Sequence, residues 1–151
     1  MFRRIALVVS LAVIGLPFAF ALPTTIRVSV ASQPVQGNGD AGSPALSANG
    51  RYLAFISKAT NLITGGTSGQ QVFLRDNETG VVRLVSKSTS GIQGNSTSNS
   101  PAISADGRYV AFYSDATNLI SGDTNGATDV FVRDVQAGTT TRVSISSSGS
   151  Q

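Results

Sequence analysis

Residues 104–120 read SADGRYVAFYSDATNLI, and residues 47–63 read SANGRYLAFISKATNLI. The two stretches lie 57 positions apart and are identical at most positions. Self-similarity at a fixed long period is the sequence signature of a repeat architecture, in which each copy forms one structural unit. The fold of this chain of 151 residues therefore depends on what a single copy can form.

The repeat extends well beyond these two stretches. Two full copies align from Ser43 and from Ser100, and one extra residue after Gly126 increases the spacing from 57 to 58. A partial copy precedes both, because VQGN at 35–38 matches IQGN at 92–95. The repeat therefore extends over the whole chain beyond its apolar N-terminal segment.

Each copy contains four segments with the composition of β-strands. They read PALS or PAIS, then RYLAFIS or RYVAFYS, then VFLRD or DVFVRD, and last VVRLVSKS or TTTRVSIS. Asn49-Gly50 and Asp106-Gly107 separate the first two segments, and such dipeptides are typical of type I′ hairpins. No segment has a sustained period of 3.6 residues, so we expect no helix beyond one turn near ATNL.

The second segment is apolar on both faces, because Val110 and Phe112 alternate with Tyr109, Ala111 and Tyr113. Such a strand is typically covered on both sides, whereas the fourth segment is more polar. A four-stranded unit with this gradient is typical of a β-propeller blade. An immunoglobulin sandwich needs about 100 residues per domain, and a β-helix has a shorter rung.

We therefore predict an all-β fold with two full four-stranded antiparallel blades and one preceding outer strand, as part of an incomplete six- to eight-bladed propeller. The expected division is a signal peptide over 1–21, the preceding outer strand plus a linker over 22–42, blade 1 over 43–99 and blade 2 over 100–151. Gln151 aligns with Gln93, so the chain ends inside a repeated motif, which we expect of a fragment of a longer protein.

The pattern S-A-D-G-R-Y-V-A-F, followed by D-V-F-V-R-D and T-T-R-V-S, resembles the TolB-like propeller repeat of bacterial secreted and periplasmic proteins. The resemblance covers residues 24–151, although the copies here are longer than those of TolB. It implies a protein-binding propeller of the cell envelope. Such repeats serve many proteins, so the resemblance says more about fold than about function.

The first 21 residues have the composition of a secretory signal peptide. Arg3 and Arg4 precede an apolar run over 5–16, and Ala19-Phe20-Ala21 matches an A-x-A cleavage site. The alternative is a retained membrane anchor, because about 20 apolar residues span a bilayer. Cleavage predicts a secreted or periplasmic protein with no membrane contact, and the absence of cysteine excludes a lipoprotein anchor.

Composition excludes several classes of function. The chain has no cysteine and no histidine, which excludes a thiol nucleophile, a zinc cluster and a histidine base. The formal net charge is +3, but beyond residue 21 the chain has 9 basic and 8 acidic side chains without a basic cluster. We therefore expect no nucleic-acid partner, no catalytic residue and no organic cofactor.

One loop has the composition of a calcium site. The stretch GDTNGATDVF at 122–131 carries Asp123, Asn125 and Asp129, which place oxygen ligands in a glycine-bearing loop. The alternative is a polar turn, which needs the same residue types. The first copy has no carboxylate in this loop, so a calcium site would belong to the second copy alone.

Two further repeated features allow a functional and a structural interpretation. Arg75-Asp76 and Arg133-Asp134 end the third segment of each copy and form either a ligand clamp or an ion pair at the end of a hairpin. Tyr52, Tyr109 and Tyr113 serve either in packing between blades or as a platform for sugars. We expect the structural role in both cases.

These observations favour a secreted or periplasmic propeller module that binds proteins or acts as a scaffold without catalysis. Its partner would be another protein, further propeller blades or, if the chain is complete, a second copy. The alternative is the propeller part of a secreted hydrolase, associated with a lactonase or peptidase, whose catalytic residues lie outside this chain. A surface lectin built from repeated blades is a third possibility.

Overall fold

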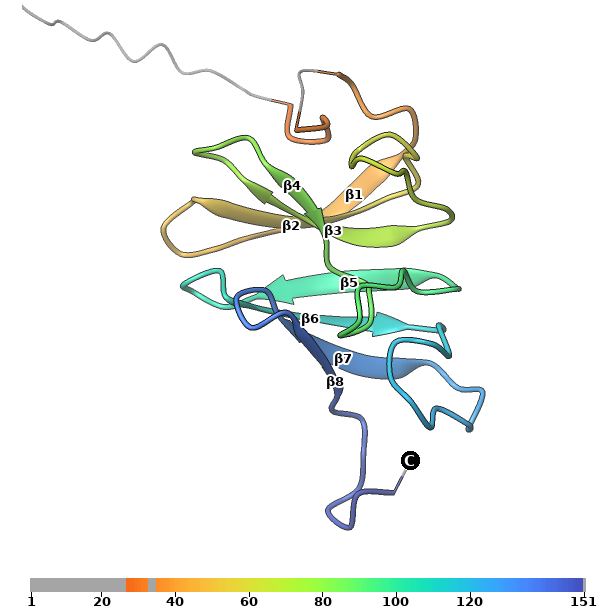
Figure 1. Ribbon diagram of the computed structural model, residues 1–151. Helices are drawn as coiled ribbons and strands as arrows, with labels where there is room; N and C mark the ends of the chain where they lie inside the picture. Colours follow the sequence, from red (N-terminus) through yellow and green to blue (C-terminus); the bar gives the residue numbers. More distant parts are fainter. Residues whose placement is uncertain (1–26, 33–34, 151) are drawn as a thin grey trace, which may run out of the picture.

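The computed structural model describes residues 27–32 and 35–150, which form two four-stranded antiparallel sheets (Figure 1). Each sheet has its strands in sequence order, and we call the first sheet blade 1 and the second blade 2. Blade 1 contains β1 (Ala41–Leu46), β2 (Tyr52–Ser57), β3 (Gln71–Asp76) and β4 (Val82–Leu84). Blade 2 contains β5 (Ser98–Ile103), β6 (Tyr109–Ser114), β7 (Asp129–Asp134) and β8 (Thr139–Arg142). The described residues include no helix, as the sequence predicts.

The two blades have the same internal register. Phe55 pairs with Phe73 across β2 and β3, and Phe112 pairs with Phe131 across β6 and β7. In each pair the rings stack with centroids 5.8 Å apart. The predicted pair of equivalent, all-β, four-stranded blades is therefore confirmed, with Phe55 and Phe112 at corresponding buried positions.

Blade 2 stacks face to face on blade 1, and Figure 1 shows the second sheet lying beneath the first. The interface is an apolar cluster contributed by both sheets: Ala54, Val72, Leu74 and Val85 from blade 1, and Val110, Phe112, Ala116, Leu119 and Phe131 from blade 2. Gly107 lies directly against the ring of Tyr52, where a Cβ atom would overlap the ring. The tyrosine therefore packs between the blades, as we expect from the sequence.

The second strand of blade 2 is covered on one face only. Tyr109 and Tyr113 on β6 are 41% and 45% exposed, whereas Phe112 on the opposite face is 1% exposed. In blade 1 the corresponding strand, β2, is covered on both faces because blade 2 packs on one of them. The described residues contain no sheet that packs on this face of blade 2, as we expect for an end blade of an incomplete propeller.

The turn between the first two strands is also different from the predicted type I′ turn. Gly50 has a φ of +72°, but Asn49 has no positive φ, and the turn closes with a hydrogen bond from Gly50 N to Ser47 O (2.9 Å). The side chain of Asn49 accepts hydrogen bonds from Ser47 Oγ (2.7 Å) and from Arg51 N (3.0 Å). Asparagine or aspartate is needed here as an acceptor rather than for a left-handed backbone.

The predicted signal peptide over 1–21 lies outside the described residues, and so do 22–26 and 33–34 of the segment predicted as an outer strand plus linker. The described residues 27–32 and 35–40 contain one isolated bridge between Val30 and Gln36 instead of a strand. They form a loop whose Val28 packs against the apolar face of blade 1 that lies away from blade 2. Blade 1 itself begins at Ala41, two residues before the repeat boundary taken from the sequence.

Packing at the interface predicts the stability of two aromatic variants. Phe112→Ala should lower the free energy of unfolding by about 3–5 kcal/mol, because it empties a fully buried site between the blades. Tyr113→Ala, one residue away on the exposed face, should cost less than about 1 kcal/mol. Urea denaturation of both variants measures the difference. Equal losses for the two variants would show that blade 2 does not pack on blade 1 in this way.

Candidate functional site

The loop at 85–95 links the two blades, and its counterpart, described at 28–32 and 35–38, precedes blade 1; we call both of them clasp loops. Each is closed internally by an equivalent backbone hydrogen bond, from Ala31 N to Val35 O (2.9 Å) and from Ser88 N to Ile92 O (2.8 Å). The loops precede the first strand of the following blade. Each clasp loop therefore belongs to the junction at which one repeat unit meets the next.

An asparagine in each clasp loop is bonded to the blade that follows. Asn95 N donates to Asn118 Oδ1 (2.9 Å), and Asn95 Oδ1 accepts from Thr117 N (3.0 Å). Asn118 Nδ2 in turn donates to Gln93 O (2.9 Å). The corresponding residues of the first copy make the same bonds: Gln36, Asn38, Thr60 and Asn61. The repeated motifs QGN and ATN therefore recognise each other, which sequence reasoning missed although both motifs recur.

The arginine that ends each third strand also contacts a clasp loop. Arg75 Nη1 donates to Val30 O (3.3 Å), and Arg133 Nη1 donates to Ser88 O (3.0 Å). Arg133 also donates to Thr140 Oγ1 (2.9 Å) on the neighbouring strand. The predicted ion pair between adjacent arginine and aspartate is therefore wrong, because the arginine is used to hold the preceding loop against the blade.

The aspartate beside each of these arginines pairs with another residue. Asp76 Oδ2 lies 2.9 Å from Arg51 Nη2, and Asp134 Oδ2 lies 2.7 Å from Arg108 Nη2. Each carboxylate also accepts two backbone N–H groups from the turn that follows it. The hydrogen bond from the arginine is the main cause that lowers the pKa of both Asp76 and Asp134 to about 2.

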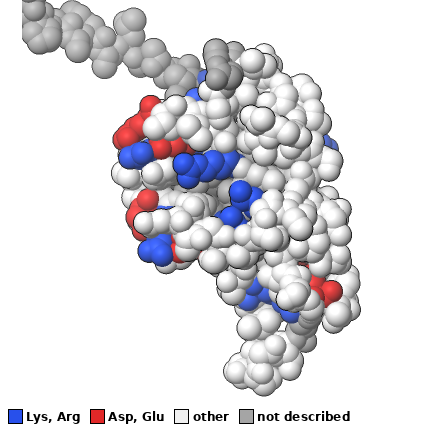
Figure 2. Space-filling view, in the orientation of Figure 1, with Lys and Arg blue, Asp and Glu red and all other residues white. Residues whose placement is uncertain are grey.

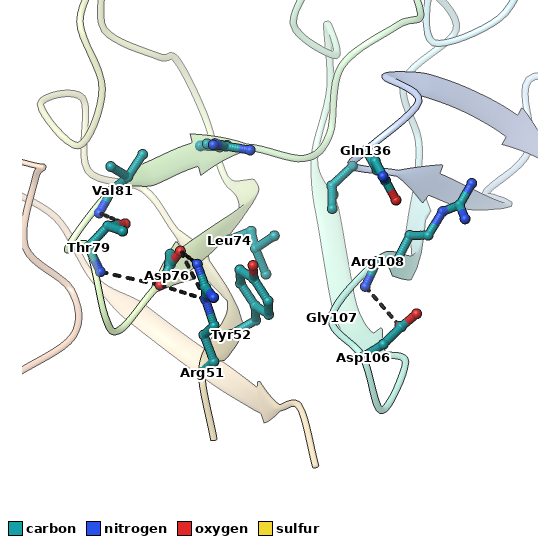
Figure 3. Close-up of a pocket in the computed structure, with 12 residues that line it drawn as sticks. Arg51, Tyr52, Leu74, Asp76, Thr79, Val81, Asp106, Gly107, Arg108 and Gln136 are labelled. Atoms are coloured by element: carbon teal, nitrogen blue, oxygen red, sulfur yellow. Dashed lines mark hydrogen bonds and ion pairs between the residues drawn. The ribbon is translucent and has the colours of Figure 1, made fainter. Parts of the chain in front are cut away.

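These ion pairs lie at one end of a groove between the two blades (Figure 3). The groove has a volume of about 620 Å³. Arg51, Tyr52 and Asp76 line it from blade 1, and the turn at 106–108 and Gln136 line it from blade 2. The Arg51 guanidinium stacks over the ring of Tyr52, with its carbon 5.0 Å from the ring centroid. We call this cavity the interblade groove.

The arginines that line the interblade groove differ in whether a carboxylate pairs with them. Arg51 and Arg108 are paired with aspartates, but Arg83, which also lines the groove from β4, forms no ion pair with any described residue. Figure 2 shows basic side chains gathered in the hollow between the blades, with acidic side chains toward one edge. An unpaired guanidinium in a groove is suited to bind a carboxylate, with which it can make two parallel hydrogen bonds.

The predicted calcium loop brings two of its three candidate ligands together, but around an arginine. Arg142 Nη1 lies 3.3 Å from Asp123 Oδ1 and 3.2 Å from Asp129 Oδ2. All three side chains are buried, with less than a tenth of their surface exposed. Asp129 Oδ1 also accepts a hydrogen bond from Ser144 Oγ (2.6 Å). The cationic group between the carboxylates is therefore the Arg142 guanidinium.

The arrangement does not fit calcium well. Arg142 supplies positive charge at the place where the two carboxylates meet, and Asn125 uses its Oδ1 to accept from Ala127 N (3.0 Å). No group of three or more acidic side chains suited to a metal occurs among the described residues. Calcium binding by Asp123, Asn125 and Asp129 remains a prediction, and it would require displacement of Arg142.

The corresponding position in blade 1 is occupied by uncharged side chains. Gln71 replaces Asp129 and Leu84 replaces Arg142, and Gln71 Oε1 accepts from Ser86 Oγ (2.6 Å). Gln71 Nε2 donates to the carbonyl oxygens of Gly94 (3.3 Å) and Ser96 (3.2 Å), which lie at the end of the clasp loop and directly after it, before β5. The two junctions therefore share a shape but differ in charge.

Comparisons with known proteins give structural likenesses only. No protein-family model matches the sequence, and no curated protein matches it. The fold is similar to a TolB-like protein from Agrobacterium tumefaciens, with a TM-score of 0.48 and 16% identity over 71% of this chain and 31% of that chain. It is also similar to the β-propeller domain of the Trilobed protease from Pyrococcus furiosus, with a TM-score of 0.45 and 16% identity over 71% of this chain and 28% of that chain.

This chain thus spans less than a third of the length of either structure. The blade architecture is established by the strand order and packing of the chain itself.

The buried charge cluster predicts how two substitutions combine. Arg142→Leu should lower the free energy of unfolding by about 3–5 kcal/mol at neutral pH, because it leaves two buried carboxylates without their cation. Adding Asp129→Gln should recover only part of this loss, since it recreates the Gln–Leu pair found in blade 1 but leaves the buried Asp123 carboxylate without a cation. Urea denaturation of the single and double variants measures both effects. A loss below about 1 kcal/mol for Arg142→Leu would show that water already solvates the carboxylates.

The ion pairs at the groove predict the stability of the chain in acid. The pKa values of Asp76 and Asp134 are lowered from 3.8 to about 2, so these groups stabilise the fold above pH 3.8 and the contribution is lost as the pH falls toward about 2. Asp134→Asn should therefore make the urea midpoint fall less steeply between about pH 4 and pH 2. Asp76→Asn with Asp134→Asn should flatten the profile further. Identical profiles for all three proteins would contradict the pairing.

Proposed function

We propose that this chain forms two adjacent blades of a secreted or periplasmic TolB-like β-propeller that binds other proteins and has no catalytic activity of its own. The observation that carries the proposal is the interblade groove, in which Arg83 is available to a ligand while the other arginines that line it are already paired. Such a groove supports recognition of an acidic side chain or a chain-terminal carboxylate of a partner protein.

The shape and composition of the groove support a peptide as its ligand. Val81 and the ring of Tyr52 offer apolar surface, and the side chain of Gln136 offers both a hydrogen-bond donor and an acceptor. Ligand sites of proteins combine a largely apolar lining with a few placed polar groups. The guanidinium of Arg83 would fix the acidic end of the peptide, and Tyr52 would contact its stem.

The chemistry of the groove gives no support to catalysis. Asp106 accepts hydrogen bonds from Ser104 Oγ (2.5 Å) and from Arg108 N (3.0 Å), and the first of these is the main cause that lowers its pKa. A carboxyl group with a lowered pKa is a poor general acid at neutral pH. Asp76 is held in an ion pair, and the sequence has no cysteine or histidine to act with either group.

Location outside the cytoplasm is supported by the N-terminal sequence. The charged start, the apolar run and the A-x-A motif before Leu22 are those of a cleaved leader. In the part of the chain that the structure describes, no helix is long and apolar enough to cross a membrane. Sequencing the N-terminus of the secreted protein tests this part of the proposal, which requires Leu22 as the first residue.

The groove can be tested with an acidic peptide as the probe. A fluorescein-labelled hexapeptide of alternating glutamate and glycine should bind the chain in fluorescence anisotropy, more weakly as salt is added. Arg83→Ala should weaken binding about tenfold, because it removes a charge-assisted hydrogen bond. Lys58→Ala is the matched control, since Lys58 is an exposed cation outside the lining of the groove.

The two variants separate specific from general attraction. If Arg83→Ala and Lys58→Ala weaken binding equally, the peptide responds only to net charge and the groove is not its site. If wild type does not bind the acidic peptide at millimolar concentration, the proposed recognition of a carboxylate in the groove is wrong.

A further inference from the structure

The fold brings three basic side chains together at the junction of the two blades, although the sequence has no run of basic residues. Arg83 on β4 lines the interblade groove, and Lys87 follows it in the clasp loop at 85–95. Arg133 comes from β7 of blade 2, and its Nη1 donates to the carbonyl oxygen of Lys87 (3.4 Å). We call Arg83, Lys87 and Arg133 the cationic cluster, and Figure 2 shows basic side chains in this hollow.

The cationic cluster has no carboxylate partner among the described residues. The ion pairs formed there use other arginines, namely Arg51, Arg108 and Arg142. Arg133 is 6% exposed and bonds only to uncharged oxygen atoms, two backbone carbonyls and one hydroxyl. Burial lowers the pKa of Arg133 despite the nearby Asp134, whose carboxylate pairs with Arg108. A buried cation normally has an anionic partner, and this one lacks it.

The charges of the cationic cluster act against one another. Burial is the main cause that lowers the pKa of Lys87, and the positive charges of Arg133 and Arg83 lower it further. Like charges that are close together disfavour the charged state of each group. The cluster is therefore unfavourable in the chain alone, and a bound anion would relieve the repulsion.

The repeat shows that the fold does not need two of these charges. Of the three residues, only Arg133 has an arginine at the same place in the other blade. Thr141 takes the place of Arg83 in blade 2, and Ile145 takes the place of Lys87. Residues that work against local stability without a structural role are expected at functional sites.

Two members of the cluster are open to a ligand. Arg83 is exposed and Lys87 is half-buried, and neither side chain forms a hydrogen bond or an ion pair with a described residue. The guanidinium presents a planar fork of donors that fits the oxygen atoms of a phosphate, and the ammonium acts as a compact point charge. One carboxylate would leave two of the three positive charges uncompensated, whereas a doubly charged phosphate leaves one.

We propose that Arg83 and Lys87, supported by the charge of Arg133, form a binding site for a doubly charged phosphate group. Arg83 and Lys87 contact the phosphate oxygens, and the buried Arg133 attracts the anion from the interface. The site rests on the same unpaired Arg83 as the proposed function, but it adds Lys87 and a second negative charge. Because the cluster includes residues of both blades, a bound phosphate also strengthens the junction.

Urea denaturation of the full chain near neutral pH tests the site with four salts at constant ionic strength. The probes are inorganic phosphate and glycerol phosphate, and the references are sodium acetate and sodium chloride. Glycerol phosphate at millimolar concentration should raise the urea midpoint, because it is doubly charged and binds the folded state only. Acetate carries one charge and should raise the midpoint far less. Stabilisation by glycerol phosphate assigns the site to the phosphate of a larger molecule, and stabilisation by inorganic phosphate alone assigns it to the free ion.

Two variants copy residues that blade 2 already carries, so that the fold is preserved. Lys87→Ile and Arg83→Thr should leave the urea midpoint in chloride unchanged or raise it, because each removes a charge that repels Arg133. Each should weaken phosphate binding about tenfold, as measured by the concentration that raises the midpoint. Lys58→Ala is the matched control, since Lys58 is an exposed cation outside the cationic cluster and should keep the full effect of phosphate.

Three results would overturn the proposal. The first is an equal urea midpoint of wild type in phosphates and in chloride, and the second is an equal reduction of the phosphate effect in all three variants. The third is a lower midpoint of Lys87→Ile in chloride with an unchanged phosphate effect, which would make the lysine structural. Acidic-peptide binding that depends on Arg83, without any effect of phosphate, would refute this site and leave the carboxylate site intact. Stabilisation by phosphate without peptide binding would do the reverse.

Discussion

The structure depends on the face-to-face contact between two sheets that are each apolar on both sides. A four-stranded sheet of this kind cannot bury its apolar faces alone. One face of blade 1 is buried only because Phe112 and Phe131 of blade 2 pack on it. The apolar contact supplies most of the burial but little directional preference. Orientation comes from polar groups at the edge, where Asn95 bonds to the ATN turn and Arg133 bonds to the clasp loop.

The interblade groove is a consequence of the same contact. The turn at 106–108 approaches blade 1 so closely that Gly107 rests on the ring of Tyr52, and this places Arg108 beside the groove. Arg51 and Arg108 are each held by an aspartate and lie over a tyrosine ring, at 5.0 Å and 4.9 Å from the ring centroids. Two of the three arginines in the groove are therefore fixed in position, whereas Arg83 forms no ion pair with any described residue.

The sequence predicted the four strands of each blade, the equivalence of Phe55 and Phe112, and the absence of a helix, because these follow from local composition and the repeat period. The predictions from the sequence failed where the partner of a side chain lies on another strand or loop, far away along the chain. Adjacent Arg133-Asp134 suggested an ion pair, but side chains of neighbouring strand residues point to opposite faces, so each residue found a different partner. The acidic loop suggested calcium because nothing local shows that Arg142 on β8 lies between Asp123 and Asp129.

The difference between Gln71 in blade 1 and the Asp129–Arg142 pair in blade 2 has a consequence for folding fidelity. Repeats with nearly identical sequences can exchange elements during folding, so that a linker engages the wrong neighbour. Gln71 can donate to the carbonyl oxygens of the loop that follows it, whereas Asp129 in that place would repel them. A chain in which β7 took the place of β3 without β8 would separate Asp129 from Arg142 and bury its carboxylate against carbonyl oxygens, and this unfavourable contact distinguishes the two otherwise similar blades.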